Sequence, residues 1–264
     1  MKKILFFTIL LAALSTMAQT PVSDTVPVGK CGGLFSVSPT LKVRFSPGNL
    51  QYQPSTHLCR FASEQTEVIG WKPFYANQRY KGWTDLFGWG TATYPNNYST
   101  DPTDYTFTDW GFYCGLPTNG GKMWRTLSME EWTYLLAKRP KARRLYAVAY
   151  VERHYGLILL PDGWKRPQGV YVKTGPKEDH ANWYDAAQWS LLEATGAVFL
   201  PCETMRAGTE AQGSASTCHY WTASPNSKKT DEALYLYVDP YVPQARSATK
   251  NLGMSVRLVQ EVEE

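Results

Sequence analysis

Apolar and polar residues alternate along several short stretches of the chain, which is the pattern of half-buried β-strands. Near the N-terminal end, residues 34–38 and 42–46 alternate in this way, and a proline follows each stretch. Proline and glycine end strands, so these stretches are predicted as two separate strands. Six later stretches give the same prediction: residues 146–151, 156–160, 197–200, 219–223, 233–238 and 255–259.

Two helix starts stand out between these strands. Ser128 is followed three residues later by Glu131, and Asp185 is followed in the same way by Gln188, which is the capping-box signature. Behind the first cap, apolar residues recur on one face of a helix predicted over residues 129–139. The sequence therefore predicts an α+β domain with two main helices around small antiparallel sheets.

Residues 70–125 follow neither a helical nor a strand period and are rich in aromatic residues, Gly, Asn, Asp and Pro. Rigid aromatic rings can bury a large apolar area without a regular backbone, provided that their polar ends find partners. We expect a long irregular region whose tryptophans pack in the core. A ligand platform made of exposed rings is the alternative.

The N-terminus has the features of a secretory signal. Lys2 and Lys3 precede an apolar run over residues 4–14, and small residues follow it, which predicts a signal peptide over residues 1–18 with cleavage before Gln19. An uncleaved anchor is the alternative, but the run is shorter than the roughly 20 residues of a membrane-spanning helix. We expect an exported protein, in the periplasm or at the cell surface, with no membrane span after cleavage.

Residues 19–32 are predicted as a short lead-in and residues 33–262 as a single domain, because no internal boundary is visible. The formal net charge is only +4, and no basic run marks a nucleic-acid-binding face. The one basic cluster follows the first predicted helix, where positive charge suits the helix dipole, so we interpret it as a solvated helix end. Its members are Lys138, Arg139, Lys141, Arg143 and Arg144.

All five cysteines follow the predicted signal, and an oxidising compartment would allow them to form disulfides. Cys202 and Cys218 bracket a polar loop that contains glycine, and they are the favoured pair. Sequence alone leaves the other pairings open.

Oxygen-bearing side chains gather in one loop of the irregular region, at Asn97, Asp101, Asp104 and Asp109. Such loops can bind calcium when their carboxylates converge. The alternative is a chain of turns in which Asn and Asp bond to their own backbone. Calcium is the one cofactor that the sequence suggests, because the four histidines have no metal-ligand spacing.

The stretch Trp-Arg-Thr-Leu-Ser-Met-Glu-Glu-Trp, residues 124–132, resembles the helix-start motif of the formylglycine-generating-enzyme (sulfatase-modifying-factor) branch of the C-type lectin-like fold. The resemblance is strongest to secreted bacterial paralogues, and it implies that the N- and C-terminal strands pair, which would place residues 35–37 near residues 256–259. Four later stretches follow the strand order of that branch: residues 197–201, 220–224, 233–237 and 253–259.

The resemblance does not by itself imply an activity. The enzymes of this branch use a closely spaced late cysteine pair, and here no cysteine follows Cys218, so no catalytic residue is assigned. Calcium-dependent lectins of the fold use triplets that residues 224–226 and 182–185 do not match. A secreted enzyme of the formylglycine-generating type and a structural subunit of a surface assembly remain alternatives.

A further branch of this fold comprises the variable proteins of diversity-generating retroelements, which present mutable side chains on their late strands. Residues 224–251 occupy the matching place. We therefore expect an exported, non-catalytic recognition module that contacts a protein or glycan, whereas an ordinary solvated edge strand is the alternative. The expected ligand-binding residues are Ser224, Asn226, Ser227, Tyr235, Tyr237, Asp239, Tyr241, Gln244, Arg246 and Ser247.

Overall fold

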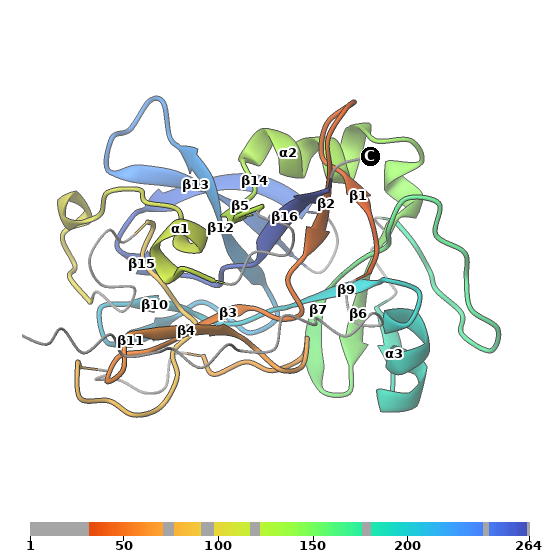
Figure 1. Ribbon diagram of the computed structural model, residues 1–264, viewed down its shortest axis with the longest axis horizontal. Coiled ribbons are helices and arrows are strands. Elements are labelled where there is room, and N and C mark those ends of the chain that lie inside the picture. Colours follow the sequence, from red (N-terminus) through yellow and green to blue (C-terminus); the bar gives the residue numbers. More distant parts are fainter. Residues whose placement is uncertain are drawn as a thin grey trace, which may run out of the picture.

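The computed structural model describes residues 32–70, 77–90, 98–116, 122–175, 181–239 and 243–262 (Figure 1). The predicted signal peptide and nearly all of the lead-in lie outside these ranges, as do the expected calcium ligand Asn97 and the expected contact residue Tyr241.

The protein is mostly β, with 37% of the described residues in strands and 14% in helical turns. The expected α+β architecture of C-type lectin-like type, with two main helices around small sheets, is therefore wrong. Both helix starts exist, and each has its capping box, but the helices are short: α2 covers Met129–Thr133 and α3 covers Ala186–Glu193. A capping box fixes where a helix begins and not how far it runs. After α2 the chain continues in a wider helical turn, η3 (Tyr134–Lys138).

The two ends of the described chain meet in a four-stranded sheet of order β1-β2-β16-β5 (Figure 1). The C-terminal strand pairs with β2 and not with residues 35–37, which lie one strand further out. The strands are β1 (Phe35–Ser36), β2 (Lys42–Phe45), β5 (Trp124–Thr126) and β16 (Leu258–Val262).

A second four-stranded sheet has the order β8-β6-β7-β9, and α3 packs against it through Trp189 and Leu192. Its central hairpin alternates strictly, so that one face joins the main core and the other joins the cluster under α3. The strands are β6 (Tyr146–Val151), β7 (His154–Leu159), β8 (Asn182–Tyr184) and β9 (Val198–Pro201).

The described ranges contain three smaller sheets as well. The late sheet has the order β12-β13-β14, with β12 (Cys218–Pro225), β13 (Glu232–Val238) and β14 (Pro243–Thr249). A second sheet joins β10 (Met205–Ala207), β11 (Glu210–Gln212) and β15 (Leu252–Gly253). The third is the hairpin of β3 (Leu50–Gln53) and β4 (Leu58–Phe61).

The described part of the irregular region contains the short helices η1 (Pro102–Asp104) and α1 (Trp110–Cys114). Trp89 and Trp110 are buried there and share one core cluster with Trp221 of the late sheet. Core packing is therefore the role of these rings. None of the helices in the described ranges is long and apolar enough to cross a membrane.

The basic cluster behind α2 corrects one interpretation of the sequence. Four of its members are exposed, but the Arg139 side chain is completely buried. Its guanidinium donates to Asp162 Oδ1 at 2.9 Å and to the carbonyl oxygens of Leu145 and Leu160. Arg139 thus ties the end of the helical segment η3, the turn η4 (Ala142–Arg144) and the end of β7 together.

Candidate functional site

The late sheet places part of the expected ligand-binding residues on one face. Side chains alternate between the faces of a strand, so directly paired residues share a face. One row of pairs is Trp221, Tyr235 and Arg246, and the next is His219, Tyr237 and Gln244. In these rows Trp221, Tyr235 and His219 are buried. Trp221 and Tyr235 belong to a core cluster. We call the outer, more accessible residues the late-sheet face: Tyr237, Asp239, Gln244 and Arg246.

The side chains of the late-sheet face hold one another in place. The guanidinium carbon of Arg246 lies 3.5 Å from the centroid of the Tyr237 ring, which is a cation–π contact. Arg246 also donates to Gln244 Oε1, and Gln244 Nε2 donates to Asp239 Oδ2 at 3.1 Å. This chain of contacts reduces the side-chain entropy that a partner would otherwise have to remove on binding.

Strand β14 forms the outer edge of this sheet. It pairs with β13 alone among the described strands, and residues 245–247 are exposed. At the free side of an edge strand, every second residue presents its N–H and C=O groups for pairing with another chain. The edge strand itself carries two of the four residues of the late-sheet face, Gln244 and Arg246, and Figure 1 shows where β14 lies in the fold.

Other expected contact residues lie elsewhere. Tyr235 is only 7% exposed and belongs to the core. Ser247 and Asn226 face the opposite side of the sheet, where Ser247 Oγ and Asn226 Nδ2 both donate to the carboxylate of Glu232.

The two remaining serines of the expected set are separated from the late-sheet face as well. Ser224 Oγ accepts the backbone N–H of Met129 at 3.0 Å, so it serves the start of α2. Ser227 is exposed in the turn between β12 and β13. The structure thus gathers four of the nine described members of the expected set on one face, and four of the other five make contacts within the fold.

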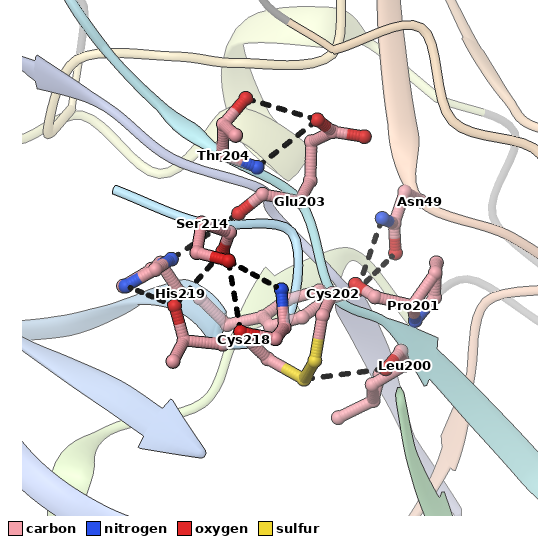
Figure 2. Close-up of a disulfide and its surroundings, with 12 residues drawn as sticks. Asn49, Leu200, Pro201, Cys202, Glu203, Thr204, Ser214, Cys218 and His219 are labelled. Carbon is pink, nitrogen blue, oxygen red and sulfur yellow. Dashed lines mark hydrogen bonds between the residues drawn. A yellow bond between two sulfur atoms is a disulfide. The ribbon is translucent and has the colours of Figure 1, made fainter. Parts of the chain in front are cut away.

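A disulfide between Cys202 and Cys218, the pair that the sequence favoured, anchors the first residue of β12 to the segment that follows β9 (Figure 2). The neighbouring His219 donates from Nδ1 to the carbonyl oxygen of Glu203, since a carbonyl can only accept. Burial lowers the pKa of His219, which favours the neutral ring. That ring lies 5.5 Å from the ring of Tyr237, so His219 packs directly beside the late-sheet face, whereas the disulfide lies on the opposite face of β12.

A second disulfide joins Cys59 of β4 to Cys114 of α1. It closes a chain segment with a sequence separation of 55, which contains most of the irregular aromatic-rich region. The two disulfides are compatible with an exported protein.

The expected calcium loop is used for local structure. Asp101 caps η1 and accepts from Thr103, whereas Asp109 caps α1 and also accepts the Thr126 backbone N–H. Asp104 accepts from the Ser99 hydroxyl. Within the described ranges, no group of three or more His, Cys, Asp or Glu side chains could hold a metal ion.

A buried carboxyl group was missed by the sequence analysis. Asp85 is 1% exposed and accepts the backbone N–H groups of Ile69 and Gly70 at 2.7 and 3.0 Å. Burial raises the pKa of Asp85 to about 7, and the nearby negative charge of Glu203 acts in the same direction. The sequence contained one signal of this burial: Asp85 stands directly before the apolar residues Leu86 and Phe87.

The raised pKa of Asp85 predicts a pH-dependent stability. Between pH 4 and pH 7 the folded protein holds a proton on Asp85 that the unfolded chain has released, so the free energy of unfolding falls as the pH rises. The variant Asp85→Asn cannot lose that proton. We therefore expect its stability, relative to the wild type, to rise from pH 4.5 to pH 7.5 in urea denaturation series. A stability difference that is the same at every pH would contradict this prediction.

Comparisons with the profiles of known protein families, with curated proteins and with solved structures found no match for this chain.

Proposed function

We propose that this protein is an exported, non-catalytic recognition module that binds an extended segment of a partner protein along β14. The observation that carries the proposal is an accessible edge strand beside a row of mutually fixed side chains.

An extended peptide segment suits this edge for two reasons. Main-chain hydrogen bonds to an edge strand provide affinity for any extended chain, and side-chain contacts on the face provide specificity. Tyr237 and Arg246 belong to the residue types that dominate binding energies at protein interfaces. Both are already ordered by their mutual contact, so little entropy is lost when a partner binds.

The structure disfavours the alternative of an enzyme that uses a late cysteine as its nucleophile. Cys202 and Cys218 are bonded to each other, and the thiolate is the nucleophilic form of cysteine. The disulfide would first have to be reduced. A subunit of a surface assembly remains an alternative, and it would use the same edge for a permanent partner.

The test compares three forms of the mature domain on an array of bacterial and host surface proteins and glycans. We expect the wild type to bind one or more proteins, and the double variant Tyr237→Ala/Arg246→Ala to lose about 30-fold in affinity, as hot-spot residues do. The matched control is Tyr171→Ala/Arg79→Ala, which removes the same two residue types from exposed positions elsewhere.

Two results would contradict the proposal. One is protein binding that both double variants retain equally. The other is binding to glycans alone that depends on Tyr237 and Arg246, since it would replace the proposed protein ligand by a saccharide at the same face.

A further inference from the structure

A tryptophan on a different sheet is exposed, in contrast to those of the core. Trp183 of β8 is 68% exposed, although its neighbours Asn182 and Tyr184 are buried. Burying an aromatic side chain removes a large apolar area from water, so an exposed indole forgoes that stabilisation.

The neighbours of Trp183 explain why it points outward. The Asn182 amide accepts the Lys173 backbone N–H and donates to the carbonyl oxygens of Val148 and Lys173. The Tyr184 hydroxyl donates to the carbonyl oxygen of Tyr171. Because both flanking side chains are fixed on the inner side of an edge strand, alternation places Trp183 on the outer side.

One face of the Trp183 ring is covered and held by stacking. The Tyr150 ring lies parallel to it, with the centroids 4.1 Å apart and an interplanar angle of 15°. Tyr150 in turn packs against the buried Tyr155, at 5.0 Å between centroids. The three rings form a column across β8, β6 and β7, and its last member presents a fixed aromatic surface to solvent.

Trp183 borders an open hollow of about 700 Å³ between the β6–β7 hairpin and the start of α3, two elements that lie side by side in Figure 1. The rest of its lining is mainly polar. It comprises Glu152, Arg153, His154, Tyr184, Asp185, Ala186 and Gln188.

Some polar atoms that line the hollow are available to form hydrogen bonds with a ligand. Asp185 Oδ1 and Gln188 Oε1 are used in the capping box of α3, but Asp185 Oδ2 and Gln188 Nε2 have no hydrogen bond within the described ranges. The side chains of Glu152 and Arg153 are exposed at the hairpin tip.

The hairpin tip is held against β8. Glu152 has a φ of 56°, a left-handed conformation that is uncommon for a residue other than glycine. Its backbone N–H donates to the carbonyl oxygen of Tyr184 at 2.7 Å. The two walls of the hollow are therefore joined by the backbone, which fixes Glu152 relative to the aromatic surface.

We propose that this hollow is a binding site for a neutral saccharide. A pyranose ring has an apolar face of C–H groups, which matches an exposed indole, and a rim of hydroxyl groups that both donate and accept hydrogen bonds. Glu152 and Asp185 supply acceptors, and Arg153 and Gln188 supply donors. The hollow has two carboxylates, those of Glu152 and Asp185, and one guanidinium, that of Arg153, so its net negative charge disfavours binding of an anionic polymer. This site is separate from the late-sheet face and does not depend on the protein ligand proposed above.

The test is native affinity electrophoresis of the full mature domain in gels that contain one dissolved polysaccharide each. The probes are hydroxyethyl cellulose, barley β-glucan, galactomannan, xylan and soluble starch, with polygalacturonate as an anionic comparison. We expect retardation by at least one neutral probe, and an affinity at least about tenfold lower for Trp183→Ala. Trp183→Phe should retain part of the affinity, because it keeps an aromatic face. Retardation should persist in EDTA, since none of the proposed contacts involves a metal ion.

Phe112→Ala is the matched control, because Phe112 is 66% exposed and lies on α1, away from the hollow. This variant and Tyr237→Ala/Arg246→Ala should bind the polysaccharide like the wild type, which separates this proposal from that for the late-sheet face. Glu152→Gln should weaken binding several-fold. Absence of retardation by every neutral probe, preference for polygalacturonate, or unchanged binding by Trp183→Ala would overturn the assignment.

Discussion

Replacing Arg139 by methionine should lower the free energy of unfolding by about 2 to 5 kcal/mol, because two buried carbonyl oxygens are left without a hydrogen-bond donor. The loss has two parts. The carbonyl oxygens of Leu145 and Leu160 lose their charged donor inside the protein, and Asp162 loses its guanidinium partner. Chemical denaturation followed by tryptophan fluorescence would measure the change.

Arg144→Met is the matched control, because Arg144 comes from the same basic cluster and is exposed. It should change the stability by no more than about 0.5 kcal/mol. Equal effects of the two substitutions would show that Arg139 is not the link between the helical turns and β7.

Replacing Cys59 and Cys114 together by alanine should cost about 4 kcal/mol, which the chain-entropy relation gives for a sequence separation of 55. The same relation gives about 3 kcal/mol for Cys202 and Cys218, whose separation is 16. Unfolding of the oxidised double variants, without reductant, would measure both values.

Reduction of the wild type provides a control for side-chain packing. A disulfide stabilises the folded protein mainly by constraining the unfolded chain. Once both proteins are treated with the same reductant, neither contains a disulfide. The wild type and the Cys59→Ala/Cys114→Ala variant should then unfold at similar denaturant concentrations. A double variant as stable as the oxidised wild type would show that this disulfide contributes little.

Local signals in the sequence predicted local structure well. Ser128 and Asp185 start helices, because a capping box involves only residues within one helical turn. The stretches predicted as strands are strands with boundaries shifted by a few residues; for example, the prediction over residues 233–238 corresponds to β13, Glu232–Val238. Helix length was not predictable in this way, and the overestimate led to the wrong fold class.

Features that depend on distant partners could not be predicted. Arg139 looks like the other members of its cluster in sequence, and only the folded chain brings Asp162 and the two carbonyl groups to it. Trp183 has the same side chain as the buried Trp221, and its exposure results from the edge position of β8. Arg246 and Ser247 were likewise expected to contact a ligand together, and only the pairing of β14 with β13 shows that they lie on opposite faces.

The accessible edge of β14 has a second consequence, which concerns self-association. An unpaired strand that accepts a partner segment can also pair with the same strand of another molecule, and such pairing is a route to aggregation. Two features of β14 oppose it: Pro243 begins the strand without an N–H group, and Arg246 brings a positive charge to its middle. When two copies approach antiparallel, these charges meet, so the residue proposed to recognise a partner would also help to keep the protein monomeric.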